Sequence, residues 1–262
     1  MKRLRETRDE CAEQVPLDAE SKKAILELHP TLRLRIGIQW HVRATAALRV
    51  AGVFSRVSQG LLEHGADPQV LRIAARAVSD EVRHASICAS LAHHYLDKEV
   101  DWPAPGVSPM PKLAHAPAEL KPTLHAVAMG CVNETIASAW LESSLRGATV
   151  PAARAAIREL IADDIHHARM GWAHLASSFV SKVARQQVGS WLPALLEAAA
   201  KPWTLKGKLH VPEGAPEHAV PSEADTLRVT TSTVHHVILP GFEALGVSTL
   251  AAREWCARTL DA

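Results

Sequence analysis

The chain has 262 residues, of which 47% are hydrophobic and 22% are charged, which is the composition of a globular protein with a substantial core. Lys and Arg number 29 and Asp and Glu number 28, so the formal charge is +1. This balance argues against a chain that binds nucleic acid or an anionic membrane through its net charge.

The first 30 residues are expected to form a charged N-terminal segment. Residues 1–10 are dense in charge and contain no apolar core, so no secretory signal is expected. No run of about 18 apolar residues occurs, so no membrane span is expected either. The four cysteines, at positions 11, 88, 131 and 256, form no C-x-x-C pair, which favours free thiols and a cytoplasmic location.

Two long helices joined by a tight turn are expected next. The first should run from Thr31, just after a proline, to His64, and Gly65 follows at the position where glycine ends helices. The second should begin at Asp67-Pro68, an N-cap acid followed by a first-turn proline, and reach Leu96.

A long connection and two further helices complete this part of the chain. The connection is rich in proline, at positions 103, 105, 109, 111 and 117. The third helix should span 118–146 before Gly147, and the fourth should begin at Pro151 and reach Val180. Each helix of about 30 residues would be ~45 Å long.

Stretches of alternating β-branched residues are almost absent, so the fold class is all-α. Two helical hairpins separated by one long crossover are the order of a ferritin-like four-helix bundle, expected over residues 31–180. Residues 181–262 are expected to be a helical extension packed on this bundle, with Pro240-Gly241 breaking its last helical stretch.

Two acid-x-x-His pairs, Glu81/His84 and Asp164/His167, fall on the second and fourth expected helices. Residues three apart share a helix face, so each pair projects together. A single pair is typical of a surface ion pair. Two pairs, each 16 or 17 residues after a Gly-Ala turn, indicate a common site, and the 15 histidines of the chain favour metal chemistry.

Glu134 lies in the middle of the third expected helix among apolar residues. A buried carboxylate there is costly unless it is paired or bound to a metal. The alternative is that Glu134 faces water at the rim of the bundle.

In these five residues and in helix order, the chain resembles the ferritin-like diiron carboxylate superfamily over residues 31–180. That family takes one Glu from each of two helices and a Glu-x-x-His from each of the other two. By position, Glu81/His84 and Asp164/His167 correspond to the two pairs and Glu134 to a lone Glu. The resemblance implies a metal centre of two iron ions, with manganese or a single ion as alternatives.

The chain departs from the family pattern at two places. Asp164 is one methylene shorter than the usual Glu, and residues 31–62 contain no acid. When the Gly65-Ala66 turn is matched to Gly147-Ala148, the position equivalent to Glu134 is Gly52. Ser55 lies one turn from Gly52 but is a poor metal ligand. This missing carboxylate leaves either an open position for O2 or substrate, or a site that has lost its function.

Four residues are candidate neighbours of the ligands: Cys88, Cys131, His166 and Ser55. Cys88 lies one turn after His84, and Cys131 lies one turn before Glu134. The alternative for the thiols is that they are small buried hydrophobic groups. His166 adjoins His167 but should point about 100° away from it on a helix.

The function expected from these features is an oxidoreductase that activates O2 or peroxide at a non-haem diiron or Mn/Fe centre. Its substrate would be a small or lipid-like molecule. The alternative is a non-catalytic ferritin-like scaffold or binding module with a degenerate metal site. Nucleic acid is not an expected partner, and a homodimer is left open.

Overall fold

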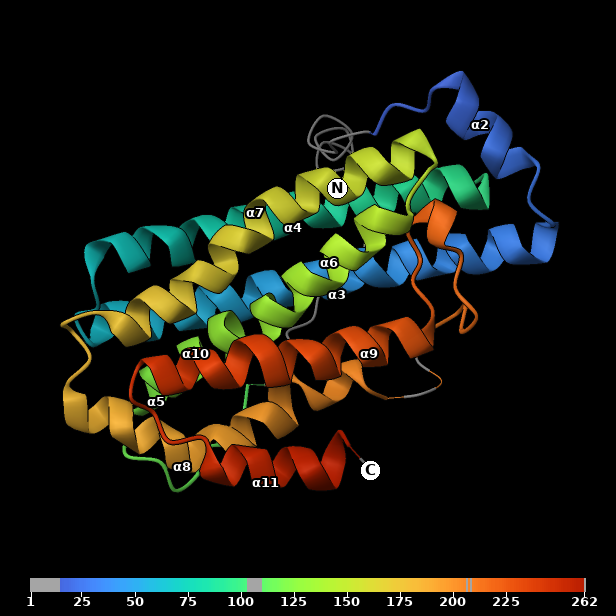
Figure 1. The fold of residues 1–262 in the computed structure, drawn as a ribbon. Coiled ribbons are helices and arrows are strands. Elements are labelled where there is room, and N and C mark those ends of the chain that lie inside the picture. The colour runs from blue at the N-terminus through green and yellow to red at the C-terminus, as the bar shows by residue number, and fades with distance from the viewer. Residues whose placement is uncertain (1–14, 103–109, 206, 208, 262) are drawn as a thin grey trace.

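The computed structural model describes residues 15–102, 110–205, 207 and 209–261. The expectations for residues 1–14 and for the prolines at 103, 105 and 109 lie outside the described residues. Within the described ranges the regular structure is helical, with no strand, which confirms the all-α class (Figure 1). No helix in these ranges is long and apolar enough to cross a membrane.

The first predicted hairpin is confirmed to within a residue or two. Helix α3 spans Pro30–Glu63, and helix α4 spans Pro68–Leu96. The Asp67 carboxylate accepts a hydrogen bond from the Gln69 amide at 2.7 Å and so caps α4. Gly65 turns the chain between the two helices with a φ of 65°, a conformation that favours glycine.

The first helix of the second hairpin has three parts, two α-helical and one π-helical between them. Helix α5 (Lys121–Ala126) continues into the π-helix η1 (Val127–Glu134) and then into α6 (Thr135–Gly147). Helix α7 (Pro151–Ala176) returns along it. The sequence predicts this pair of helices but not the π-helical turns, which are rare in proteins and frequent at functional sites.

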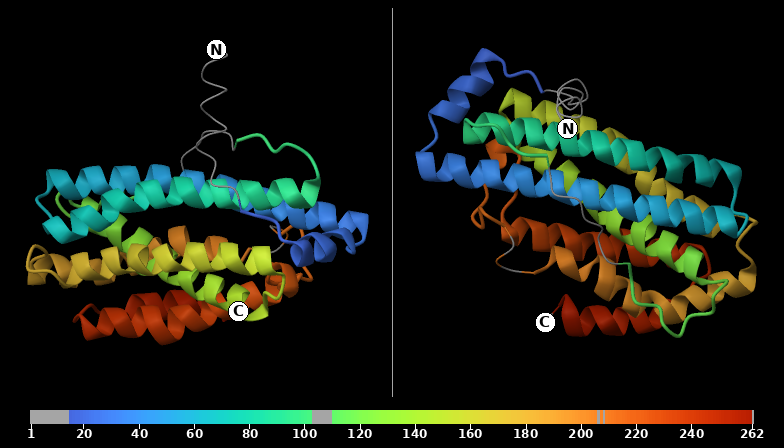
Figure 2. Two further views of the ribbon diagram at one scale, coloured as in Figure 1. Left: turned by 90° about the horizontal axis from the view of Figure 1, so that it is seen from above. Right: turned by 180° about the vertical axis from the view of Figure 1, so that it is seen from behind.

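The four long helical segments pack around one another in a ring. Helix α3 packs on α4, α4 packs on α7, α7 packs on η1 and α6, and α5 closes the ring against α3. Helix α4 ends at the opposite end of the molecule from the start of α5, so the chain must cross the bundle between them (Figures 1 and 2).

Two glycines set the spacing between η1 and α7. A Cβ on Gly130 would lie 2.5 Å from the Gly171 nitrogen, and one on Gly171 would lie 2.6 Å from the Cys131 nitrogen. A side chain at either position would push the helices apart. The same contact brings Glu134, four residues after Gly130, close to His167, four residues before Gly171.

The remaining helices are short and lie outside the ring. They are α2 (Ala19–Leu26), α8 (Lys182–Ala199), η2 (Lys201–Trp203), η3 (Pro216–His218), α9 (Glu223–Thr233), the π-helix η4 (Val234–Ile238), α10 (Leu239–Ala244) and α11 (Leu250–Thr259). Helices α8 and η4 pack on η1, and α9 packs on α6. The residues after 180 therefore share a hydrophobic core with the third long segment.

The predicted break at Pro240-Gly241 is wrong. Helical structure runs without interruption from Glu223 to Ala244, and Pro240 lies in the first turn of α10. The π-helical turn before the proline changes the local hydrogen-bond pattern, so a residue without an amide hydrogen is accommodated.

Candidate metal centre

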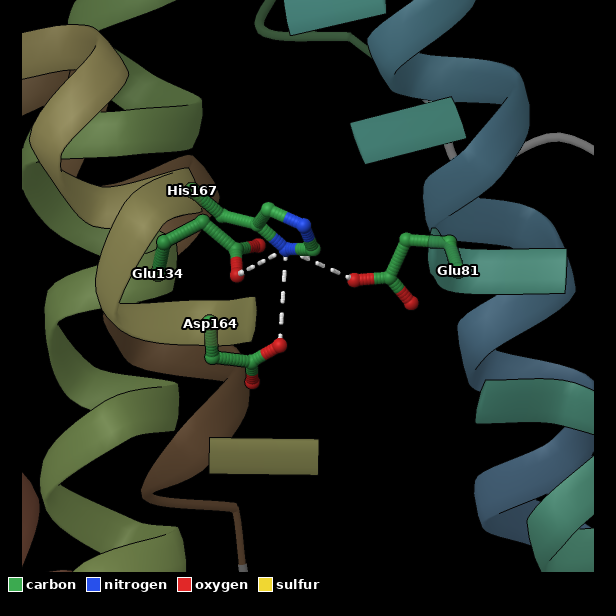
Figure 3. A group of neighbouring side chains, drawn as sticks. All are labelled: Glu81, Glu134, Asp164 and His167. Carbon is green, nitrogen blue, oxygen red and sulfur yellow. Dashed lines mark ion pairs between the residues drawn. The ribbon is translucent and has the colours of Figure 1, made fainter. Parts of the chain in front are cut away.

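The five predicted ligands come together inside the bundle. Glu81 and His84 lie on α4, Asp164 and His167 on α7, and Glu134 is the last residue of η1. All five side chains are buried. Figure 3 shows Glu81 facing Glu134, Asp164 and His167 across the space between the helices.

The Nδ1 atom of His167 lies at the meeting point of three carboxylates. It is 3.3 Å from Glu81 Oε1, 3.4 Å from Asp164 Oδ1 and 3.7 Å from Glu134 Oε2 (Figure 3). One ligand atom from each of these four residues lies within 4.8 Å of the others.

His84 lies beside this group of four and faces two of its members, Glu81 and Asp164. Its Nδ1 atom lies 3.6 Å from Glu81 Oε2 and 3.6 Å from Asp164 Oδ1. The two oxygens of Glu81 therefore face two different imidazoles, and Asp164 Oδ1 is close to both.

The polar atoms of this cluster make ion-pair contacts with one another, but two of them form no hydrogen bond of good geometry. Among the described residues, Asp164 Oδ1 and His167 Nδ1 are buried and have no hydrogen-bond partner. Burial without a partner costs about 1–3 kcal/mol for each group. Ligands bound to one ion by bonds of about 2.1 Å lie roughly 3–3.5 Å apart, so the donor set fits a cation between these atoms.

Two further carboxylates lie next to the Nε2 atoms of the histidines, on the side of each ring that faces away from the cluster. Asp163 on α7 accepts a hydrogen bond from His84 Nε2 on α4 at 3.2 Å, and Asp80 on α4 lies 3.4 Å from His167 Nε2 on α7. A carboxylate behind a ligating histidine fixes the ring so that the other nitrogen faces the metal. The acid-x-x-His spacing predicts neither Asp80 nor Asp163, although each directly precedes the acid of one of these pairs.

Arginines on α4 neutralise these outer carboxylates. Arg83 pairs with Asp163 and, at 3.2 Å, with Glu159, while Arg76 pairs with Asp80 at 3.3 Å and with Asp163 at 3.4 Å. Burial raises the pKa of Asp163, but His84 and Arg83 outweigh it and hold that pKa below its usual value. Asp163 is therefore ionised and able to accept from His84.

The inner carboxylates differ in their affinity for protons. Burial, with a contribution from the neighbouring acids, raises the pKa of Glu134 to about 7, and burial also raises the pKa of Asp164. The pKa of Glu81 is lowered, because His167 and His84 outweigh the effect of burial. Glu81 is thus the carboxylate that most readily stays ionised between the imidazoles.

The histidines hold protons when no metal is bound. Burial lowers the pKa of His84, but Glu81, Asp164 and Asp163 outweigh it and raise that pKa to about 9. The pKa of His167 is also raised, by Asp164, Glu134 and Glu81, against the effect of burial. A metal ion would displace these protons, so binding and proton release are coupled.

Helix α3 contributes an aromatic wall to the site. The fully buried ring of Phe54 lies 5.2 Å from the ring of His167, centroid to centroid. Gly52 is half-buried, and Ser55 is exposed with its hydroxyl donating to the Ala51 carbonyl at 3.2 Å. The structure therefore places Ser55 away from the buried cluster.

The other predicted neighbours divide into buried thiols and an exposed histidine. Cys88 and Cys131 are buried and free. Burial raises the pKa of Cys88 to about 12 and that of Cys131 well above its usual value, so both are uncharged thiols. His166 is exposed on α7, whereas His167 next to it is buried.

Asn133 connects the site to the C-terminal helices. Its amide nitrogen donates to Glu134 Oε1 at 2.9 Å, and its amide oxygen accepts from Trp203 Nε1 at 3.2 Å. No sequence motif marks Asn133, because its partner Trp203 is 70 residues away. The position of Glu134 thus depends on η2 as well as on η1.

Comparisons of the chain with protein-family models, with curated proteins and with solved structures found no match.

Proposed function

We propose that this protein is a ferritin-like non-haem metal oxidoreductase with a dinuclear centre of iron, or of iron and manganese. The observation that supports this most strongly is the position of Glu81, whose two oxygens face the Nδ1 atoms of His84 and His167. Carboxylate and imidazole donors suit these metals. When bound, such a pair of ions supplies the redox chemistry that activates O2 or peroxide.

The residues of the chain would have separate tasks. Glu81 and Asp164 would bridge or ligate between the two imidazoles, and Glu134 would complete one side of the site. Asp163 and Asp80 hold the imidazole rings in the orientation that faces the ligands. Phe54 would shield the site from water on the side of α3, where the sequence offers no carboxylate.

The second candidate is a non-catalytic binding module with a degenerate site. Two features of α3 favour this alternative. Gly52 stands where a fourth carboxylate is expected, and the ring of Phe54 lies beside His167. In this candidate the site has decayed and no reaction of a bound metal is needed, whereas the oxidoreductase requires a metal that reacts.

Oxygen consumption separates the two candidates. Iron(II) is added to metal-depleted full-length protein without oxygen, and O2 uptake is then followed after mixing with aerated buffer. If the protein is an oxidoreductase, its iron(II)-loaded form consumes O2 faster than free iron(II) does. Glu81→Gln should reduce the rate of O2 uptake to that of free iron(II). The control Glu119→Gln, at an exposed position, should consume O2 at the wild-type rate. Uptake no faster than that of free iron(II) would overturn the oxidoreductase.

A further inference from the structure

A cavity of about 330 Å³ lies between α3, η1 and α8. Small side chains leave this space open, since three of the residues that line it are Ala128, Ala198 and Ala199. An apolar cavity of about 150 Å³ in a protein core is large enough to bind benzene. The present cavity therefore has room for a molecule of about two fused rings.

The described residues around the cavity carry no charge at neutral pH. None of them is Asp, Glu, Lys or Arg, and the two polar ones are His125 and Asn133. Burial lowers the pKa of His125, so its ring is neutral at pH 7. The amide nitrogen and oxygen of Asn133 are already bonded to Glu134 and Trp203. A charged ligand would lose its hydration here and gain no opposite charge, whereas an apolar ligand gains by leaving water.

The cavity joins the interior of the bundle to the surface. Val53 and Met129 in its wall are buried, whereas Ala198 and Pro202, on the side of α8 and η2, are exposed. A ligand can therefore enter from solvent between α8 and the bundle and reach the buried wall.

Two of the segments that form the cavity also form the candidate metal centre. On α3, Val53 lines the cavity and the next residue, Phe54, has its ring against that of His167. On η1, Asn133 lines the cavity and donates a hydrogen bond to Glu134 at 2.9 Å. A ligand in contact with Asn133 is therefore one residue away from a candidate metal ligand.

We propose that this cavity binds an uncharged, hydrocarbon-like molecule of about two rings, and that molecules of this class are the substrate of the neighbouring site. The binding follows from the size of the cavity, its apolar walls and its lack of charged groups. The assignment as substrate rests on the proposed function, whereas binding can be measured without any reaction.

The experiment is a calorimetric titration of the full-length protein at pH 7 with three compounds that share one ring system and differ in charge. They are 2-naphthalenemethanol, which is neutral, the anion 2-naphthoate and the cation 2-naphthylmethylammonium. We expect the alcohol to bind at one site per chain with a Kd of about 0.1 mM or below. Each ion should bind at least about tenfold more weakly. Failure of the alcohol to bind, or an ion that binds as tightly as the alcohol, would overturn the proposal.

Variants that fill the cavity test its location. Ala199→Phe on α8 and Val50→Phe on α3 each place a ring in this space and should weaken binding of naphthalenemethanol at least about tenfold. Ala194→Phe makes the same change at an exposed position of α8 and should bind as wild type does. Circular dichroism shows which variants are folded, and the two filling variants enter the cavity from different helices. Wild-type affinity in a folded filling variant would contradict the site.

The metal content of the same samples separates this proposal from the proposed function. Binding of naphthalenemethanol to a protein that takes up no metal would confirm the binding site and refute its role as a substrate site. Metal uptake without binding of naphthalenemethanol would refute the cavity proposal and leave the metal centre in place.

Discussion

Asp163 on α7 accepts a hydrogen bond from His84 on α4, while the equivalent Asp80 on α4 faces His167 on α7. Each helix therefore orients the candidate ligand of the other. The relationship links the packing of α4 against α7 to the geometry of the metal site, so neither histidine is oriented by its own helix alone.

We predict that Asp163→Asn lowers metal affinity by about 10- to 100-fold, because His84 loses its ionised acceptor. Affinity is measured by competition with a chelator for iron(II) or manganese(II). Glu159→Gln is the matched control, since Glu159 also lies on α7 and pairs with Arg83 but does not touch a candidate ligand. Equal affinity in Asp163→Asn and wild type would contradict the orienting role.

We predict that Gly171→Ala destabilises the fold by about 1–3 kcal/mol or more and also weakens metal binding. The new Cβ would lie 2.6 Å from the backbone of η1, so Glu134 would be moved away from His167. Urea unfolding and the chelator assay measure the two effects.

Gly60→Ala provides the comparison for the glycine prediction. The atoms nearest to its new Cβ are 3.5 Å away, an ordinary contact, and alanine is the better helix former by about 1 kcal/mol. This variant should be as stable as wild type or more so. Equal stability of Gly171→Ala and Gly60→Ala would show that the close approach is not needed.

We predict that His174 makes the stability of the metal-free protein fall below neutral pH. Burial lowers the pKa of His174 to about 4, while an unfolded histidine titrates near 6.5. Between these values the unfolded state binds the extra proton, so stability is full above about 6.5 and declines as the pH falls toward 4. At pH 5, His174 lowers the free energy of unfolding by about 2 kcal/mol relative to its value above pH 6.5.

The measurement is urea unfolding at pH 7.5 and pH 5 for wild type and His174→Gln, both with a chelator. The pKa values of His84 and His167 are raised, so these two residues stabilise the fold as the pH falls. They are present in both proteins, so the difference in pH dependence between wild type and His174→Gln measures the contribution of His174. The pH effect should be smaller in His174→Gln by about 2 kcal/mol. An equal effect in both would mean that His174 is not held neutral.

The sequence predicts those parts of the structure that depend on local signals. The N-cap acid Asp67, the turn at Gly65 and the first-turn proline Pro151 place the helix ends to within a few residues. The five candidate ligands follow from helix spacing and from the high cost of burying Glu134. These features need no knowledge of which helix packs on which.

The parts that the sequence does not predict depend on contacts between distant segments. The π-helix η1 arises where Gly130 meets Gly171, and Asn133 gains its role from Trp203. The reach of Asp163 to His84 depends on the rotation of α7 against α4. The doubled acids Asp80-Glu81 and Asp163-Asp164 are a sequence signal, and reading them as a repeat would have indicated the outer pair.

The most direct test of a dinuclear site is the metal content of the full-length protein, purified from cells supplied with iron and manganese and measured by mass spectrometry. We predict about two equivalents of iron, or of iron and manganese together, for each chain. Glu81→Gln should lose at least one of them, while the exposed Glu119→Gln retains both. No bound metal in the wild-type protein, or full metal content in Glu81→Gln, would contradict the site described here.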